Sequence, residues 1–212
     1  MQGISHIRKD YTLQTLSENE VALNPIEQFN KWWDEAVKSE IEELNAMTLA
    51  TASAEGVPSA RIVLLKEYNE RGFVFFTNYE SAKGQELTEN PRATLLFFWK
   101  ELERQVKITG MVEKITATES DEYYYSRPLG SRIGAWASPQ SQIIENREWL
   151  EKRVEDLNKQ NEEDIKRPSH WGGFRVKPVM IEFWQGRPSR LHDRIQYTLE
   201  DHGKWKIERL AP

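Results

Sequence analysis

Residues 46–77 read AMTLATASAEGVPSARIVLLKEYNERGFVFFT, in which apolar runs alternate with tight turns. We expect strands at 46–52, 58–68 and 73–77. The two connecting segments are short, and each contains a glycine. A tight turn joins antiparallel neighbours, whereas parallel neighbours need a long crossover, so this stretch predicts an antiparallel sheet.

The rest of the chain continues the pattern and adds helices. Further strands are expected at 93–99, 105–115, 178–184, 190–199 and 205–210. Helices are expected from Pro25 after an Asn24 cap, at 81–89, from a Thr118 cap with Asp121 up to Pro128, and at 143–163. No repeat with a period of 20 to 50 residues is visible. Helices set between short strands favour a mainly β, α+β class, with one antiparallel barrel and peripheral helices.

The N-terminal segment lacks the periodic pattern of the later residues. Residues 1–23 show no apolar period, so we expect an N-terminal arm there and a single domain over 24–212. A length of 212 residues suits one β-rich domain of this kind.

The charge of the chain is concentrated in one segment. The formal net charge is −5 and 30% of residues are charged, but 14 of the 23 residues in 145–167 carry a charge. The other 189 residues hold 49 charges, close to the ordinary share of about 25%. Because that remainder also contains most of the 8 Trp, 7 Tyr and 8 Phe, disorder is excluded for most of the chain.

Composition also excludes several classes of function. No apolar run approaches the roughly 20 residues of a membrane helix, and no signal-peptide core follows Met1. The absence of cysteine excludes disulfides and thiolate chemistry and is compatible with a cytoplasmic location. An acidic balance argues against nucleic-acid binding. The four histidines are never at metal-ligand spacing, and no glycine-rich phosphate loop or serine nucleophile elbow is present, so we expect no metal site.

Several cationic residues lie on predicted strands at positions that the stability of a β-barrel does not require. In the segment Arg190-Leu-His-Asp-Arg194, strand alternation predicts that Arg190, His192 and Arg194 share one face. One interpretation is a solvated outer face; the other is a site for an anion or a polar ring, since guanidinium groups match phosphate geometry.

Two further patterns leave the same choice open. Arg61 and Lys66 are five residues apart, so a regular strand points them to opposite faces and they serve either as surface charges or as ligands of different anions. Tyr123 and Arg127 are four apart and share a helical face, which Ser131 continues. This pattern is typical of an exposed amphipathic helix or of a binding site.

Taken together and in order, these segments resemble the pyridoxine/pyridoxamine 5′-phosphate oxidase family over nearly the whole chain. The segments that carry the resemblance are Arg61-Ile-Val-Leu-Leu-Lys66, Leu102-Glu-Arg-Gln105, Ser126-Arg-Pro128, Ile133-Gly-Ala-Trp136, Trp171-Gly-Gly-Phe-Arg-Val176, Ile181-Glu-Phe-Trp-Gln-Gly186, Arg190-Leu-His-Asp-Arg194 and Arg209-Leu-Ala-Pro212. The resemblance implies an FMN-binding split β-barrel homodimer, with FMN at the subunit interface. It also implies oxidation of pyridoxamine or pyridoxine 5′-phosphate to pyridoxal 5′-phosphate, with O2 reduced to H2O2.

The resemblance assigns roles by position. FMN-binding residues are expected to be Arg61, Phe76, Thr77, Lys83, Gln105, Gln140, Ser141, Trp184 and Arg194. The substrate phosphate is expected at Lys66, Tyr123, Arg127 and Ser131. Arg190 and His192 are expected against the pyridine ring as catalytic residues, and Arg8 and Tyr11 on a mobile arm that covers the substrate. The reaction implied is hydride transfer to flavin N5, in which the cofactor carries the electronic work.

Ala82 departs from the family, which often has a basic residue before the lysine at position 83. Two alternatives remain at this point: another split-barrel flavin reductase with a different substrate, or a non-catalytic carrier of flavin or pyridoxal phosphate.

Overall fold

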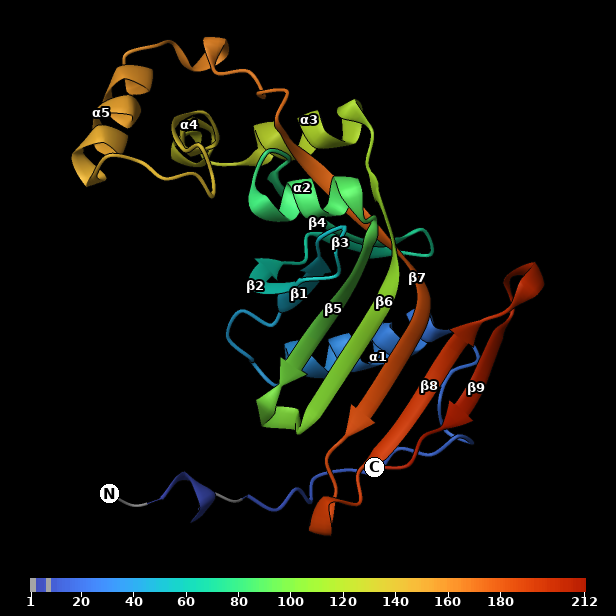
Figure 1. Cartoon of the computed structure of the whole chain (residues 1–212). Helices are drawn as coiled ribbons and strands as arrows, with labels where there is room; N and C mark the ends of the chain where they lie inside the picture. The colour runs from blue at the N-terminus through green and yellow to red at the C-terminus, as the bar shows by residue number, and fades with distance from the viewer. Residues whose placement is uncertain (1–2, 7–8) are drawn as a thin grey trace.

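The computed structural model describes residues 3–6 and 9–212 and shows one curled antiparallel sheet with helices around it (Figure 1). Its strands are β1 (Ala46–Ala52), β2 (Pro58–Leu64), β3 (Glu67–Asn69), β4 (Gly72–Asn78), β5 (Arg92–Trp99), β6 (Arg104–Lys114), β7 (Trp171–Gln185), β8 (Asp193–Leu199) and β9 (Trp205–Arg209). The sheet order is β2-β1-β5-β6-β7-β4-β3, and β8 joins β7 to β9. Each of these pairings is antiparallel, which confirms the predicted class.

Five α-helices are present in the described part of the chain: α1 (Pro25–Lys38), α2 (Ala82–Glu89), α3 (Ala117–Ser126), α4 (Leu129–Ala137) and α5 (Arg147–Asn158). Short 3₁₀ turns lie at Ile4–His6, Lys100–Leu102, Glu162–Asp164, Pro188–Arg190 and Asp201–Gly203. As predicted, Asn24 caps α1, where its side chain accepts a hydrogen bond from the backbone N–H of Ile26. None of the helices in the described residues has the length and apolar content needed to cross a membrane.

The core forms between α1 and the concave side of the sheet. The apolar face of α1 is buried, and Phe29 lies 5.1 Å from Phe73 on β4 between ring centroids. Trp32 lies 5.1 Å from Phe183 on β7 in an edge-to-face arrangement. Aromatic side chains bury large apolar areas, so this helix and sheet stabilise each other.

The strand predicted at 58–68 is in fact two strands. The backbone N–H of Leu65 donates to Asn45 O, while that of Lys66 donates to Val74 O. The chain therefore leaves its pairing with β1 and begins to pair with β4 between these residues. Neither the length nor the apolar content of the segment marks this change of partner.

Strand β7 is longer than the predicted 178–184. It begins at Trp171, and Gly172 and Gly173 pair with β4. A Cβ at Gly173 would lie 2.4 Å from the side chain of Ile115, so glycine here allows close packing within the sheet and does not mark a turn.

Two helical predictions were wrong at their boundaries. The cap of α3 is Thr116, with Glu119 completing a capping box, and not Thr118 with Asp121. Helix α5 covers only 147–158 of the predicted 143–163, and none of its residues is buried. Charged residues have adequate helix propensity, but a helix with so little apolar contact has few packing interactions to extend it.

The predicted strand at 190–199 begins only at Asp193. Pro188 starts a 3₁₀ turn, and Ser189 and Arg190 have left-handed φ values of 56° and 62°. The alternation that was expected to align Arg190, His192 and Arg194 therefore does not exist, because only Arg194 lies on a strand.

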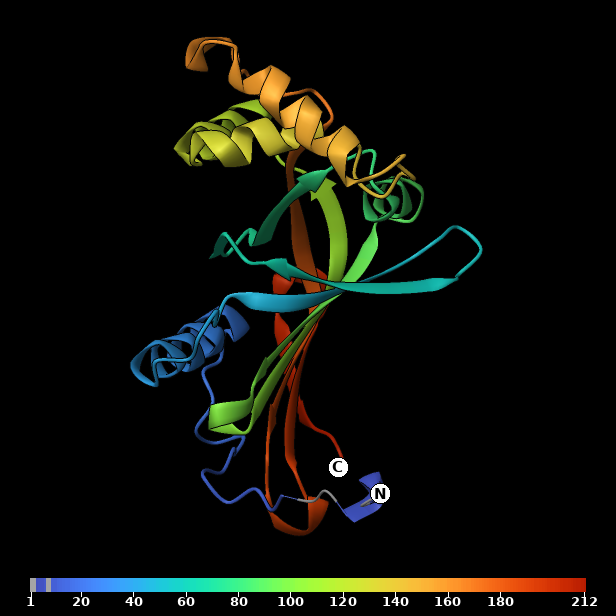
Figure 2. The same ribbon diagram turned by 90° about the vertical axis from the view of Figure 1, so that its left-hand side faces the viewer.

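The elements are arranged so that the molecule has two different ends. Helices α2 to α5 gather at the end where β7 begins, and the β7–β8 connection, the C-terminus and the N-terminal segment lie at the other (Figures 1 and 2). The two sets of predicted site residues lie at these two ends.

Candidate functional site

A cavity of about 590 Å³ lies at the helical end of the sheet. Eight of the predicted residues line it: Lys66, Phe76, Thr77, Lys83, Tyr123, Arg127, Ser131 and Gln140. They come from separate segments between the end of β2 and the start of α5, so the fold assembles this cavity from residues far apart in sequence.

Arg127 is one of three cationic residues that line this cavity, with Lys66 and Lys83. The guanidinium lies 4.5 Å from the ring centroid of Trp171, and its Nη1 atom is buried without a hydrogen-bond partner. Burial lowers the pKa of Arg127, and among the described residues no carboxylate pairs with it. A half-buried cation without a counter-charge still loses part of its hydration, and an anionic ligand would supply the missing partner.

The side chains of Lys66, Tyr123, Arg127 and Ser131, here called the clamp cluster, line this one cavity. The sequence predicted that Tyr123, Arg127 and Ser131 share one helical face, but they belong to two helices. Arg127 is the C-cap of α3 and Ser131 belongs to α4, so the bend between the two helices directs them inward. Tyr123 stacks on Phe76 with ring centroids 3.9 Å apart.

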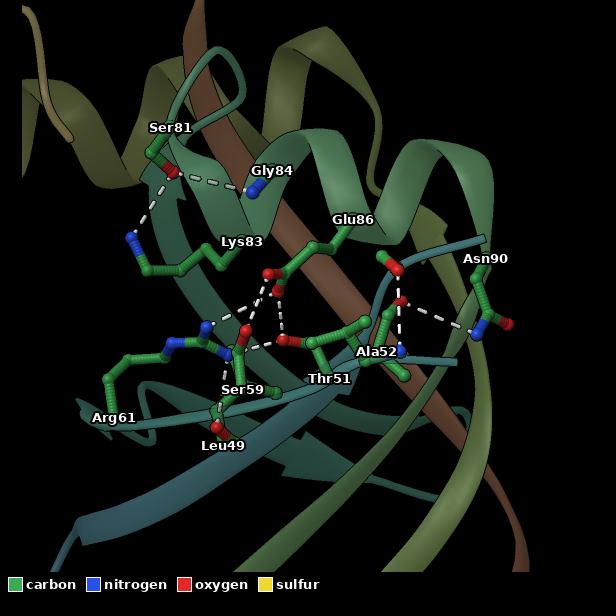
Figure 3. Close-up of polar contacts among 12 residues, drawn as sticks. Leu49, Thr51, Ala52, Ser59, Arg61, Ser81, Lys83, Gly84, Glu86 and Asn90 are labelled. Atoms are coloured by element: carbon green, nitrogen blue, oxygen red, sulfur yellow. Dashed lines mark hydrogen bonds and ion pairs between the residues drawn. The ribbon is translucent and has the colours of Figure 1, made fainter. Parts of the chain in front are cut away.

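Lys83 occupies a second part of the cavity. Its Nζ donates to Gln140 Oε1 at 3.0 Å and to the Thr77 hydroxyl at 3.2 Å. It also donates to the Ser81 hydroxyl at 3.2 Å (Figure 3). Burial and the positive charge of Arg61 lower the pKa of Lys83. Two cations this close favour an anion between or beside them.

Arg61 lies beside this group but does not line the cavity. Its guanidinium donates to Leu49 O at 3.2 Å and to Glu86 Oε2 at 3.3 Å, and Thr51 contacts both side chains (Figure 3). Glu86, on α2, also accepts from Ser59 Oγ at 2.7 Å. Despite its burial, these hydrogen bonds and Arg61 lower the pKa of Glu86. Sequence reasoning missed Glu86, although its position three residues after Lys83 places both on one helical face.

Six further predicted residues meet at the opposite end of the sheet. In the sheet register, Trp184 lies opposite Gln105 on β6 and opposite Arg194 on β8. The ring centroid of Trp184 is 4.5 Å from that of His192 and 5.9 Å from that of Tyr11. The loop cluster comprises Tyr11, Gln105, Trp184, Arg190, His192 and Arg194.

Within the loop cluster, the hydrogen bonds of His192 define its state. Nδ1 accepts the backbone N–H of Arg187 at 3.1 Å, so the proton of the neutral ring resides on Nε2. Burial lowers the pKa of His192, and the nearby charge of Arg190 lowers it further. His192 is therefore built as a neutral hydrogen-bond donor through Nε2.

We expect His192 to titrate below the ordinary histidine value of about 6.5. Removing the charge with Arg190→Gln should raise this pKa but leave it below the ordinary value, because burial is the larger cause. The pKa falls because burial and the charge of Arg190 both disfavour the protonated imidazolium in the folded protein. Protonation of His192 therefore requires a more acidic solution. Imidazole NMR resonances followed against pH, and assigned with His192→Asn, measure this shift; an unperturbed titration would refute the assignment.

Three predicted positions lie at the exposed surface or outside the described residues. Arg8 lies outside the described residues. Ser141 is exposed, with φ 71°, and follows Gln140 at the cavity edge. Arg190 is also exposed, in the left-handed turn before β8.

The clamp cluster and the loop cluster are well separated in one chain. Trp171, at the cavity, and Trp184, in the loop cluster, lie near opposite ends of β7. At about 3.3 Å per residue, the strand between them is roughly 40 Å long. One chain thus carries two partial sites, and no single ligand of ordinary size reaches both.

Comparison with protein families gives two matches in succession. Residues 33–161 match the family described as pyridoxamine 5′-phosphate oxidase. Residues 171–212 match the pyridoxine 5′-phosphate oxidase C-terminal dimerisation region, which covers β7, β8 and β9.

Individual proteins agree with these matches. A pyridoxine/pyridoxamine 5′-phosphate oxidase of Nostoc punctiforme is 60% identical, covering 99% of this chain and 98% of its own. One of Polynucleobacter asymbioticus is 59% identical, covering 100% of both. Among solved structures, PhzG of Burkholderia lata 383, in complex with tetrahydrophenazine-1-carboxylic acid, is 30% identical, with a TM-score of 0.86 over 94% of this chain and 99% of its own.

Proposed function

Because the chain belongs to the pyridoxine/pyridoxamine 5′-phosphate oxidase family, we propose that it oxidises pyridoxamine and pyridoxine 5′-phosphates to pyridoxal 5′-phosphate. FMN is the proposed cofactor, and O2 is the proposed electron acceptor that leaves as H2O2. The observation that carries the proposal is the half-buried Arg127 side chain, whose buried Nη1 lacks a hydrogen-bond partner in a cavity lined by the rest of the clamp cluster.

The clamp cluster suits the phosphate of the substrate. Lys66 and Arg127 supply positive charge, and the hydroxyls of Tyr123 and Ser131 can donate hydrogen bonds. Phosphate oxygens prefer such charge-assisted donors. The clamp would fix the position of the ring through its phosphate, so that the reacting carbon is oriented before the reaction begins.

The residues around Lys83 fit the phosphate of FMN. Burial and the nearby charge of Arg61 lower the pKa of Lys83, and Arg61 is ion-paired with Glu86. Ala82 contributes no third cation. Thr77 and Gln140 would add hydrogen bonds, while Gln105, Trp184 and Arg194 would contact an FMN from the loop cluster, so that one FMN meets these two sets from different chains. When bound, FMN supplies a hydride acceptor at N5.

The separation of the two clusters supports a site shared by two chains. A twofold-related partner would place its loop cluster against the clamp cluster of the first chain, and the reverse, giving two equivalent sites. Apolar side chains on the strands support such a contact: Ile62, Phe98, Met111 and Val179 are 66%, 53%, 40% and 41% exposed.

In this arrangement, Arg190 and His192 would face the pyridine ring. Because Nδ1 of His192 already accepts a backbone N–H, the neutral ring can donate from Nε2 to an acceptor on the substrate. The proposed role is orientation and charge stabilisation, with water taking the substrate proton. For the amine substrate, loss of hydride leaves an imine, which water hydrolyses to the aldehyde and ammonia.

One experiment separates this function from the alternatives. The purified protein is first examined for a flavin spectrum and then given pyridoxamine 5′-phosphate under air, with pyridoxal 5′-phosphate and H2O2 assayed. We expect bound FMN and equal amounts of both products. A flavin reductase would bind FMN without forming pyridoxal 5′-phosphate, a carrier would bind either ligand without turnover, and a protein that takes up no FMN would overturn the proposal.

A further inference from the structure

We infer that Glu103 is a positioning residue that anchors the segment from Tyr11 to Leu16, here called the arm segment, over the loop cluster. The inference rests on the proposed function for its effect on substrate, but its structural part stands independently. Glu103 belongs to the segment Leu102-Glu-Arg-Gln105, of which the proposed site uses only Gln105.

The Glu103 carboxylate is buried, with 2% of the residue exposed. Its Oε2 accepts the backbone N–H of Thr12 at 2.8 Å and that of Leu13 at 3.1 Å. Both donors lie about 90 positions earlier in the chain. Hydrogen bonds to a charged acceptor are stronger than neutral ones, so this one side chain can hold the segment against the sheet end.

The backbone of Glu103 is itself held in an unusual conformation. Its φ is 55°, a left-handed value that is uncommon outside glycine. The Gln185 side chain donates to Leu102 O at 3.2 Å and Glu103 O at 3.3 Å, and the backbone N–H of Gly186 donates to Glu103 O at 2.7 Å. The end of β7 thus directs the carboxylate toward the arm segment.

Gly186 gives a second, independent observation. A Cβ at this position would lie 2.6 Å from Cδ2 of Tyr11, and the φ of Gly186 is not left-handed. Glycine is therefore required by the contact with the arm segment and not by the backbone. Tyr11 rests on this glycine, with its ring centroid 6.1 Å from that of His192.

Further contacts fasten the segment along its length. Arg104 donates to the side chain of Gln14 at 2.7 Å, and Asp193 accepts the backbone N–H of Leu16 at 3.1 Å. Asp193 directly follows His192, so the arm segment is fastened next to the turn that carries His192. Glu103 and Gly186 therefore hold the arm segment so that the Tyr11 ring lies beside Trp184 and His192.

The test uses Glu103→Gln, which removes the negative charge of the side chain and keeps its shape. Glu101→Gln is the matched control, because Glu101 is exposed in the same turn. Hydrogen exchange of the peptide covering 9–16 is measured in the protein as purified, without substrate. We expect exchange at Thr12 and Leu13 to be at least about tenfold faster in Glu103→Gln and unchanged in the control.

Kinetics supply the functional readout. We expect the KM for pyridoxamine 5′-phosphate to rise about tenfold in Glu103→Gln with kcat changed less than about twofold, because the arm segment acts on binding. In a Tyr11→Ala background the same change should have a smaller effect, since Glu103 acts through this segment.

Gly186→Ala leaves the Glu103 carboxylate intact. If Glu103→Gln does not fold, this variant alone tests whether the arm segment is held at this position. It should also speed exchange at Thr12 and Leu13 and raise KM. Unchanged exchange in both variants would overturn the inference, whatever the substrate proves to be. Faster exchange in a protein that does not oxidise pyridoxamine 5′-phosphate would instead overturn the proposed function and leave the anchor in place.

Discussion

Replacing Arg127 with alanine is expected to lower kcat/KM for pyridoxamine 5′-phosphate about a hundredfold, because a charge-assisted contact to the phosphate is lost. The same variant should retain kcat/KM for pyridoxamine, which has no phosphate, within about twofold of the native protein. The reason is that the half-buried guanidinium lies over Trp171, its Nη1 has no hydrogen-bond partner, and the phosphate is its proposed partner. Steady-state kinetics with both substrates measure the difference.

Two controls make this result specific. Arg127→Lys should recover only part of the loss, because lysine lacks the planar fork that matches two phosphate oxygens. Arg147→Ala should behave as the native protein, since Arg147 is exposed and paired with Glu151 on α5. Equal losses with pyridoxamine and its phosphate would show that Arg127 acts on the fold of the cavity and not on the phosphate.

Much of the fold could be predicted because its signals are local. Tight turns and apolar runs predicted the antiparallel sheet, and Asn24 predicted the start of α1. The errors lie where a distant partner decides the structure. At Lys66 the chain stops pairing with β1 and begins to pair with β4, and β7 starts early because β4 lies beside it. A local sequence pattern does not show which strand lies alongside.

Most of the residues expected in the site fall into two clusters in the structure, but their local geometry differs from the expectation. Arg190 and His192 were assigned to a strand face, yet they lie before the strand, where Pro188 and two left-handed residues turn the chain. The segment Gly186-Arg-Pro188 contains two residues that commonly interrupt strands and was a signal for this turn. Glu86 and Glu103 were not predicted, because a carboxylate that positions another residue has no sequence pattern of its own.

Mixed dimers provide the strongest test of the division between the clusters. Chains carrying Arg127→Ala are co-expressed with chains carrying His192→Ala, and dimers containing one of each are isolated through two affinity tags. If each site combines the clamp cluster of one chain with the loop cluster of the other, one site receives both defects and the other receives none. The mixed dimer should then have about half the native activity, although each parent is nearly inactive.

A second mixed dimer makes the interpretation unambiguous. Arg190→Ala chains combined with His192→Ala chains place one defect in every site, so this pair should remain inactive. If instead both clusters of one chain served the same site, the first mixed dimer would be equally inactive, because each chain would carry its own defect. The roughly 40 Å of β7 between Trp171 and Trp184 argues against that arrangement, since one flavin and one substrate cannot span the distance within a chain. Activity in the first mixed dimer and its absence in the second would therefore assign the two clusters of each site to different chains.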